Sequence, residues 1–295
     1  MKKIALFAAV CAAFVLAGCS KKTAASGKTL IGLSVSTQNN PFFVTLVDGA
    51  KNEATAEGCE LTVVDANDDV VKQVSDIEDL VSKKIKVLIV NPVDSTAVAP
   101  AVTTAKKAGI PVIAVDRTVI GETVNCQIAS DNVAGAKMAG EYLLSLVGEG
   151  AEVAELQGIP GASATIDRGT GFHQAVDGKL KIDASLTANF NRAEGLSVTE
   201  NLLQSHGNIK GIFAHNDEMA LGAVEAAASA GKKIVIVGFD ATDDAVAAVK
   251  DGRMAATVAQ QPAEMGKVAI QTAMKLTKGE SVPASLPVVV SLIKK

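Results

Sequence analysis

Residues 87–91 read VLIVN, and after a helix-like segment residues 111–116 read PVIAVD. The same order returns about half a chain further on, where residues 211–216 read GIFAHN and residues 234–240 read IVIVGFD. In each half a short apolar run ends in Asn, a helical segment ends at Ala-Gly, and a second apolar run ends in Asp. Short apolar runs that alternate with helices are typical of buried parallel strands in βαβ units. The repeat predicts two facing lobes, each with an amide and a carboxylate at the carboxyl ends of its strands, that share one polar ligand.

Strand-like runs and amphipathic segments alternate along the rest of the chain. Helices are expected at residues 44–57, 95–108, 133–147, 218–230 and 262–278, and a glycine stops each of the first four. Strands are expected at residues 30–36, 61–65, 87–91, 112–116, 125–129, 152–156, 182–187, 212–215, 234–239, 257–260 and 288–293. This alternation indicates an α/β protein with parallel sheets, and this many strands suit two sheets better than one. We expect the final helix and strand to pack back on both lobes.

The first residues have the features of an export signal. Lys2 and Lys3 precede an apolar run that is too short to span a membrane as a stable helix, and residues 16–19 read LAGC. This ending resembles a bacterial lipobox, in which the cysteine, here Cys19, carries the lipid. An ordinary secretory signal with an incidental cysteine is the alternative. We therefore assign residues 1–18 to a signal peptide and residues 19–28, which are small and polar, to a lipid-anchored flexible linker.

Composition narrows the range of functions. The chain has 295 residues, with 28 basic and 32 acidic side chains and a formal net charge of −4. It has no basic stripe, so nucleic acid is not expected as a partner. Its length suits two domains of ordinary size. Cys59 and Cys126 fit no metal or redox spacing, and although an exported protein could bridge them, we expect two free, buried thiols.

Aromatic residues are scarce and unevenly placed. The chain has no Trp, one Tyr and eight Phe, and four of the Phe residues lie beside polar residues at predicted strand ends or loops: Phe42, Phe43, Phe190 and Phe239. Any one of them could be a hydrophobic plug. Together, in a chain whose core consists of Val, Ile, Leu and Ala, they predict stacking surfaces for a sugar. The C–H faces of a sugar pack on aromatic rings, while its hydroxyls need convergent donors and acceptors.

Polar side chains at the same strand ends can supply those donors and acceptors. A carboxylate accepts two hydroxyls, and Arg donates in a fixed fork. Alone, Asn91 could be a turn residue, and Arg117 beside Asp116 could be a surface ion pair of little energetic value. Their common location after parallel strands in both halves favours a binding role. The candidates are Asn40, Asn91, Asp116, Arg117, Arg168, Asn216, Asp240 and Gln260.

Patterns typical of enzymes are weak. Residues 32–36 (GLSVS) lack the second glycine of a nucleophile elbow, and residues 169–171 (GTG) lack the strand-to-helix context of a dinucleotide fingerprint. The three histidines have no metal-ligand spacing. His215 is expected to face away from the site, and Asp94 and Asp217 are interpreted as helix N-caps. We therefore expect no catalytic group, no cofactor and no bound metal.

Several longer segments match a known family. They read STQNNPFF at residues 36–43, NPVDS at 91–95, IASDN at 128–132, ELQG at 155–158, FAHNDEMA at 213–220 and VGFD at 237–240. With these segments, the chain from Lys28 to Lys295 resembles the periplasmic sugar-binding proteins of ribose-type ABC importers. The resemblance implies two Rossmann-like lobes that are joined by three crossovers and close on the sugar like a hinge.

The resemblance also implies where the lobes begin and end. Residues 29–130 plus 261–289 would form the N-terminal lobe, and residues 131–260 plus 290–295 the C-terminal lobe. The crossovers are then expected near residues 130–131, 260–261 and 287–290.

The ribose-binding pattern of this family is intact in the chain. Phe42 and Phe43 match the paired rings of one lobe and Phe190 the ring of the other, while the matching hydrogen-bonding set is Asn40, Asp116, Arg117, Arg168, Asn216, Asp240 and Gln260. The departures are residues 165–167 (TID) and His215, which stands where the family often has Gln. Neither removes a sugar contact, though either could shift affinity. The resemblance implies D-ribose as the ligand, with another pentose or furanose, or autoinducer-2, as alternatives.

Three classes of protein share this architecture. The first is a monomeric, non-enzymatic receptor in the periplasm or at the cell surface, held to a membrane by a lipid, that delivers D-ribose to an ABC permease; a chemoreceptor is left open as a further partner. The second is a Rossmann-fold sugar enzyme, against which stand the missing nucleotide fingerprint, base and metal set. The third is the effector core of a sugar-responsive repressor, which needs an N-terminal DNA-binding segment where this chain has an export signal.

Cys19→Ala should release the protein in soluble form or leave the precursor uncleaved, because the Cys19 thiol is the predicted lipid acceptor. Cys11→Ala, within the apolar run, is the matched control and should do neither. Membrane fractionation and mass spectrometry of the mature N-terminus measure both effects. An unmodified N-terminus that starts after another residue would contradict the lipobox.

Overall fold

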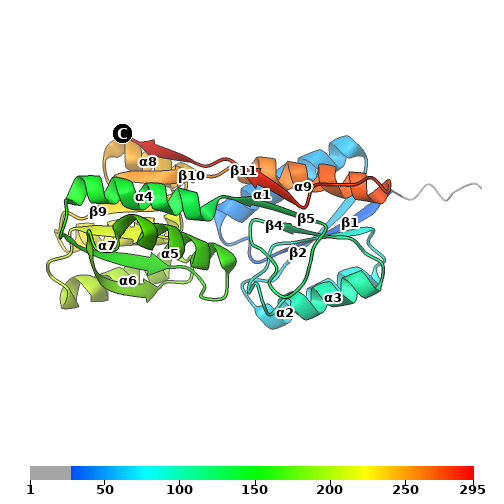
Figure 1. Ribbon diagram of the computed structural model, residues 1–295, viewed down its shortest axis with the longest axis horizontal. Coiled ribbons are helices and arrows are strands. Elements are labelled where there is room, and N and C mark those ends of the chain that lie inside the picture. Colours follow the sequence, from blue (N-terminus) through cyan, green and yellow to red (C-terminus); the bar gives the residue numbers. More distant parts are fainter. Residues whose placement is uncertain (1–27) are drawn as a thin grey trace, which may run out of the picture.

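The computed structural model describes residues 28–295, and the predicted signal peptide, Cys19 and most of the linker lie outside these residues. The described chain forms two lobes that lie side by side along the long axis of the molecule (Figure 1). Each lobe contains one six-stranded sheet with helices on both faces. The predicted α/β class with two mainly parallel sheets is confirmed.

The sheet of the first lobe, here called the N-lobe, has the strand order β11-β5-β4-β3-β1-β2 and is parallel throughout. One face packs against the adjacent helices α1 (Pro41–Glu57) and α9 (Pro262–Thr277), and the other against α2 (Val70–Ser82) and α3 (Ala99–Lys107). The strands are β1 (Leu30–Val35), β2 (Glu60–Asp65), β3 (Val87–Val90), β4 (Val112–Val115), β5 (Cys126–Ser130) and β11 (Ser285–Val288).

The second lobe, the C-lobe, repeats this plan with the order β12-β10-β9-β8-β6-β7, in which only the edge strand β12 is antiparallel. Its helices are α4 (Asn132–Val147) and α5 (Ser163–Val176) on one face, and α6 (Arg192–Ser205), α7 (Asp217–Ser229) and α8 (Asp243–Asp251) on the other. The strands are β6 (Glu152–Gln157), β7 (Lys181–Thr187), β8 (Gly211–Ala214), β9 (Val235–Asp240), β10 (Ala256–Ala259) and β12 (Ser291–Lys294).

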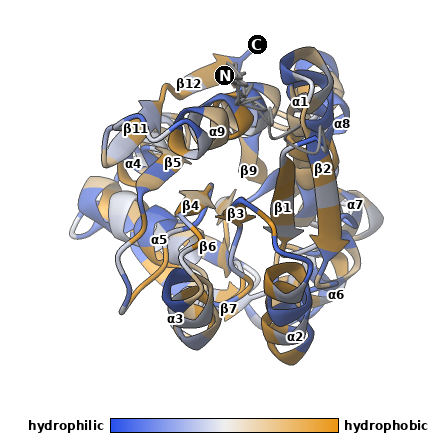
Figure 2. Ribbon diagram, turned by 90° about the vertical axis from the view of Figure 1, so that its right-hand side faces the viewer, coloured by the Kyte–Doolittle hydropathy of each residue, from blue (hydrophilic) through white to orange (hydrophobic). Residues whose placement is uncertain are grey.

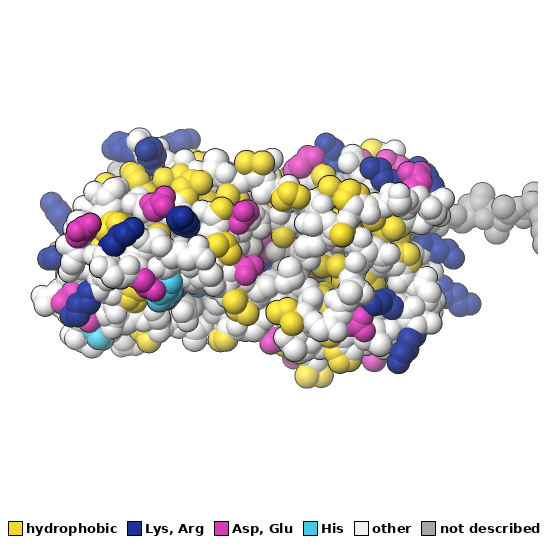
Figure 3. Space-filling model, viewed as in Figure 1, with side chains coloured by type: hydrophobic (Ala, Val, Ile, Leu, Met, Phe, Trp, Pro, Cys, Tyr) yellow, Lys and Arg dark blue, Asp and Glu magenta, His cyan; other side chains and the backbone are white. Residues whose placement is uncertain are grey.

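Burial on both faces of each sheet explains why the central strands consist of apolar residues. Every residue of β3, β4 and β8 is buried, as expected of central parallel strands covered by helices. The strands accordingly stand out as hydrophobic against more polar helix surfaces (Figure 2). Charged side chains are scattered over the outer surface without forming one large patch on the face shown in Figure 3.

Glycine permits the closest helix contact in the N-lobe. A Cβ atom on Gly266 of α9 would lie 2.0 Å from the backbone oxygen of Leu46 in α1, and one on Gly49 would lie 2.2 Å from the backbone oxygen of Ala263. Only glycine fits at both positions, so the two helices approach each other backbone to backbone. The N-lobe core is therefore closed by a helix from near the end of the chain.

Three element predictions need correction. The helix expected at residues 44–57 begins at Pro41, because the Asn40 side chain caps it by accepting a hydrogen bond from the Phe42 N–H at 2.9 Å. The helix expected at 95–108 begins only at Ala99, because Asp94 accepts from the N–H groups of Thr96 and Ala97 and holds a separate turn first. The strand expected at 288–293 is two short strands, since the chain changes lobe between β11 and β12.

Cys59 and Cys126 are buried and unpaired, as expected. Both belong to the apolar core beneath α1 and α9. Burial raises the pKa of both thiols, which keeps them protonated and unreactive.

The chain passes between the two sheets three times: from β5 to α4, from β10 to α9, and from β11 to β12 (Figure 1). Hydrogen bonds also join the lobes away from these crossings. The Ser95 N–H donates to Gly161 O at 3.0 Å, the Ser163 N–H to Ser95 Oγ at 3.0 Å, and the Thr118 N–H to Ser163 Oγ at 2.9 Å. The lobes are thus closed on each other in this structure.

Among residues 28–295, no helix combines the length and the apolar character that crossing a membrane requires.

Candidate functional site

The polar strand ends of both lobes meet at one cavity between them. Its free space is about 10 Å³, which is room for about one water molecule. A larger ligand can enter only if the lobes move apart or side chains turn aside. Most of the predicted site residues line this cavity, and one residue that was not predicted, Ala164, joins them: the set is Asn40, Phe42, Phe43, Asp116, Arg117, Ala164, Arg168, Phe190, Asn216, Asp240 and Gln260.

Four buried charges form the centre of the site, one acid and one base from each lobe. Asp116 and Arg117 follow β4, and Asp240 ends β9 opposite Arg168 of α5. All four are at least 94% buried. Burial raises the pKa of both carboxyls, that of Asp240 well above its ordinary range, and lowers the pKa of both guanidinium groups. In each case the opposite charges nearby counteract the shift.

The distances between these charges leave hydrogen-bonding capacity unused. Arg117 Nε lies 3.8 Å from Asp116 Oδ2, and Arg168 Nη1 lies 3.7 Å from Asp240 Oδ1. Both separations exceed an ordinary hydrogen bond. Arg117 Nε has no hydrogen-bond partner among the described residues. A ligand with several hydroxyls could satisfy acids and bases at once, since a hydroxyl both donates and accepts.

Aromatic rings hold both guanidinium groups. The Arg117 guanidinium lies 5.3 Å from the ring centroid of Phe43 in the N-lobe and 5.2 Å from that of Phe190 in the C-lobe. The Arg168 guanidinium lies 3.9 Å from the ring of Phe239. Such cation–π contacts are attractive when desolvated. They stabilise the guanidinium groups at the site without using their N–H groups.

Two of the predicted site residues, Asn91 and Phe239, lie behind the cavity instead of lining it. Asn91 Nδ2 donates to Asp116 Oδ2 and to Val115 O, each at 3.2 Å, and its Oδ1 accepts from the Ser36 N–H at 3.1 Å. Asn91 therefore orients Asp116 across three strand ends. Phe239 is fully buried in the C-lobe core, and its ring packs against the Arg168 guanidinium on the side away from the cavity.

The two asparagines at the site also cap helices. Asn40 caps α1, and Asn216 caps α7 by accepting a hydrogen bond from the Met219 N–H at 3.0 Å. Asn216 Nδ2 also donates to Phe190 O at 3.1 Å. Each amide is thereby fixed at a helix N-terminus that points toward the cavity.

Three lining residues and one neighbour have a positive φ angle. The φ angles are 64° at Asp116, 59° at Phe190 and 127° at Asp240, and 58° at Ala241, which follows Asp240. Such conformations cost of order 1–3 kcal/mol each in residues other than glycine, and they concentrate at functional sites. The neighbouring contacts must hold these residues in place.

One such support was missed in the sequence. Asp217 was interpreted as a helix N-cap, but Asn216 takes that position and Asp217 is fully buried. Its carboxylate accepts from the Thr242 N–H at 2.8 Å and from Thr257 Oγ1 at 2.7 Å, and Thr257 Oγ1 accepts from the Ala241 N–H at 3.2 Å. Asp217 therefore fixes the strained turn that follows Asp240. Position next to a helix start gave the wrong role, and nothing in the sequence distinguished Ala164 from other small helical residues.

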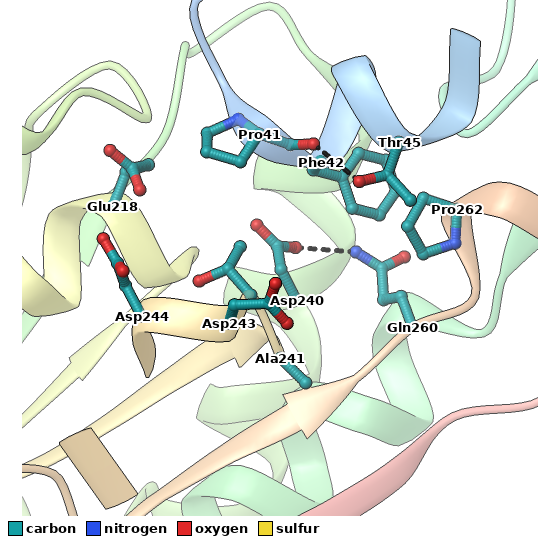
Figure 4. A pocket seen from close by; sticks show the side chains of 11 residues that line it. Pro41, Phe42, Thr45, Glu218, Asp240, Ala241, Asp243, Asp244, Gln260 and Pro262 are labelled. Carbon is teal, nitrogen blue, oxygen red and sulfur yellow. Dashed lines mark hydrogen bonds between the residues drawn. The ribbon is translucent and has the colours of Figure 1, made fainter. Parts of the chain in front are cut away.

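A wider pocket of about 420 Å³ lies beside the cavity and shares Phe42, Asp240 and Gln260 with it. In Figure 4 Gln260 and Asp240 point toward each other, and Gln260 Nε2 donates to Asp240 Oδ1 at 2.7 Å. Gln260 Oε1 has no hydrogen-bond partner among the described residues. Glu218 and Asp244 lie across this pocket from Phe42 (Figure 4). Of the four central charges, only Asp240 lines this pocket.

Within residues 28–295 no group of three or more His, Cys, Asp or Glu side chains is placed to hold a metal ion. His215 does not line the cavity, and its ring is bonded to Glu155 at 2.8 Å.

Two parallel-sheet lobes, three crossings and a polar cavity lined from both sides define a two-lobed ligand-binding protein. Comparison with known sequences agrees: the model of the periplasmic binding protein domain matches residues 31–281, and the chain belongs to this family. It is 49% identical to the ribose import binding protein of Haemophilus influenzae, over 95% of this chain and 97% of that protein. It is 46% identical to the ribose import binding protein of Bacillus subtilis, over 97% of each.

A solved structure supports the same assignment. The periplasmic solute-binding protein of an ABC transporter from Actinobacillus succinogenes, with bound D-allose, superposes with a TM-score of 0.85 at 34% identity and covers 91% of this chain and 98% of its own. These relatives are described as binding proteins and not as enzymes, which favours the receptor over the enzyme among the three classes considered.

Asp217→Asn should flatten the dependence of stability on pH between pH 8 and pH 5. Burial raises the pKa of Asp217 to about 7, so the folded protein takes up a proton at a pH where the unfolded chain, with its ordinary carboxyl pKa near 3.8, does not. The wild type should therefore gain stability as the pH falls through 7. Where the folded protein holds one proton more than the unfolded chain, the free energy of unfolding rises by about 1.4 kcal/mol for each pH unit. Urea unfolding midpoints across this range measure the effect. Equal slopes in both proteins would show that Asp217 is ionised throughout.

Proposed function

We propose that this chain is an extracytoplasmic binding protein that captures D-ribose between its two lobes and delivers it to an ABC permease. The observation that carries the proposal is the cavity lined by two acids, two arginines and the rings of Phe42, Phe43 and Phe190 from both lobes. The similarity to ribose import binding proteins over nearly the whole chain supports D-ribose as the ligand.

The geometry suits a small polyhydroxylated ring. Phe42 and Phe43 lie edge to face with their centroids 5.1 Å apart on the N-lobe side, and Phe190 lies on the C-lobe side. A sugar ring could pack its C–H faces between them once the Arg117 guanidinium, which now contacts Phe43 and Phe190, turns aside. The carboxylates of Asp116 and Asp240 would accept hydroxyl donors, and Arg117 and Arg168 would donate to hydroxyl oxygens. A neutral sugar suits this site because the four charges already balance.

Capture would work by closure of the lobes about the three crossings. Neither lobe alone can satisfy all hydroxyls, so the ligand binds the closed form better than the open form, and this difference shifts the hinge equilibrium. We propose lobe boundaries at residues 29–130 plus 261–289 and 131–260 plus 290–295, which place the hinge at the crossings. The near-absence of free space in the closed cavity supports entry through an open form.

The remaining parts of the proposal concern location and assembly. Residues 1–18 direct export, and a lipid on Cys19 holds the mature protein to a membrane through the linker at 19–28. The lobes act as a monomer in the periplasm or at the cell surface, and a chemoreceptor is a second possible partner of the closed form. The LAGC segment and the family assignment support export.

Calorimetry of the mature protein against D-ribose, D-allose, L-arabinose and myo-inositol should show tightest binding of D-ribose. In the same assay Asp116→Ala and Asp240→Ala should each weaken D-ribose binding by roughly ten- to a hundredfold. Removing one partner of a buried, charge-assisted hydrogen bond costs on the order of 1.5–3 kcal/mol.

Asp48→Ala is the matched control, because it removes an exposed carboxylate from α1 of the same lobe. It should bind D-ribose as the wild type does. Wild-type affinity in both site variants would rule out this cavity, whereas tighter binding of another sugar would replace D-ribose and keep the site.

Small-angle scattering should give a smaller radius of gyration with saturating D-ribose than without ligand, because closure brings the two lobes together. Both samples come from one preparation, and calorimetry confirms saturation. An unchanged radius with confirmed binding would mean that the lobes do not close on the ligand.

A further inference from the structure

Behind the residues that line the cavity, the carboxylate of Glu155 lies between two histidines. Glu155 of β6 is fully buried, and its Oε1 is 2.8 Å from Nε2 of His215, which follows β8 and is also fully buried. Its Oε2 accepts from Gln157 Nε2 at 2.8 Å and lies 3.7 Å from Nε2 of His173, a partly exposed residue of α5. None of these side chains lines the cavity.

This cluster touches the site through one backbone carbonyl. Arg168 Nη1 donates to His215 O at 2.5 Å, and Arg168 Nε donates to Asn132 Oδ1 at 2.9 Å. Two hydrogen bonds hold His215 in place. Its backbone N–H donates to Leu156 O at 2.9 Å, and its ring is hydrogen-bonded to Glu155. The position of the guanidinium therefore depends on the position of residue 215.

The protonation state of the imidazole follows from its surroundings. Nε2 faces Glu155, while Nδ1 is buried with no hydrogen-bond partner among the described residues. A neutral ring with its proton on Nε2 leaves only a lone pair unsatisfied, whereas a doubly protonated ring would bury an unpaired N–H group. Burial lowers the pKa of His215, and Glu155 opposes this shift while Arg168 and His173 add to it.

Glu155 is ionised in the same range of pH. Burial alone would raise its pKa, but the hydrogen bond and charge of His215, with hydrogen bonds from Ser185 and Gln157, bring the pKa of Glu155 to about 2. The charged groups that face His215 are thus Glu155 of β6 and Arg168 and His173 of α5. Arg168 in turn is surrounded by four carboxylates, those of Asp240, Asp116, Asp217 and Asp167.

We propose that His215, held by Glu155, is a positioning residue for Arg168 and that protonation of His215 weakens ligand binding, an inference that rests on the proposed function. Protonation places a second positive charge behind Arg168, and closure of the lobes brings Arg117 to the same cavity. The protonated ring therefore favours the open form, where water still reaches Arg168. Affinity should fall as the pH drops through the pKa of His215, which lies below the ordinary 6.5.

Calorimetry with D-ribose from pH 8 to the lowest pH at which the protein stays folded compares the wild type, His215→Gln and His206→Gln. Gln at 215 has no titrating group and can still donate to Glu155. Wild-type affinity should fall about tenfold for each unit by which the pKa of His215 differs between open and closed forms. The fall should be smaller in His215→Gln and unchanged in His206→Gln, the matched control, because the His206 ring pairs with Asp183 and not with Glu155 or Arg168. Equal slopes in the wild type and His215→Gln would overturn the proposal.

A second measurement needs no ligand. The chain has three histidines, so nuclear magnetic resonance of the 15N-histidine-labelled protein can follow each imidazole, with His→Gln variants for assignment. Arg168→Met should raise the pKa of His215, because it removes a positive charge that lowers this pKa. If His215 titrates identically with and without the arginine, the coupling does not exist. Absence of D-ribose binding at every pH would instead reject the proposed function, and the titration would still decide the coupling.

Discussion

The balance of four buried charges governs this structure. Asp116 and Arg117 come from one lobe, Arg168 and Asp240 from the other, and each lobe alone would hold a carboxylate and a guanidinium side by side at its strand ends. A buried charge is costly unless it is paired and hydrogen-bonded. In an open form, water can supply hydrogen bonds to these charged groups. In a closed form, the opposite lobe or a polar ligand must supply them. The charges thus link solvation of the site to the distance between the lobes.

Much of the surrounding structure holds these charges in demanding conformations. Asp116 and Asp240 both have positive φ angles, and each is steadied by a polar group that the cavity does not expose: Asn91 for the first and the Asp217–Thr257 pair for the turn after the second. Each support reaches the site from a neighbouring strand or helix. The chain tolerates local strain at the binding surface because hydrogen bonds from Asn91, Asp217 and Thr257 hold the strained residues in place.

The sequence predicted the fold well because the spacing of apolar residues and the glycines that end helices are local signals. Asp116, Arg117, Asn216 and Asp240 could be predicted because they follow the strands of the repeat, whereas the remaining lining residues depended more on the family resemblance. The roles behind the surface were harder to predict. Asn91 and Phe239 lie at the expected strand ends, yet their side chains support neighbours, since a residue's direction depends on tertiary contacts. Asp217 has the local pattern of a cap, and only the register of β9 and β10 shows what it bonds. The split of the last strand likewise depends on two sheets that a local pattern cannot locate.

The packing of α9 against α1 bears on the order in which the chain can fold. The N-lobe begins at Leu30, but its core is sealed only by α9 and its sheet completed only by β11, which end at Thr277 and Val288. Such contacts have a high sequence separation and are slow to form. Until the last residues emerge, the first lobe exposes the apolar face of α1, while most of the C-lobe can already assemble. A protein that crosses a membrane as an unfolded chain gains from this delay, because the N-lobe cannot complete its fold until α9 and β11 have been synthesised.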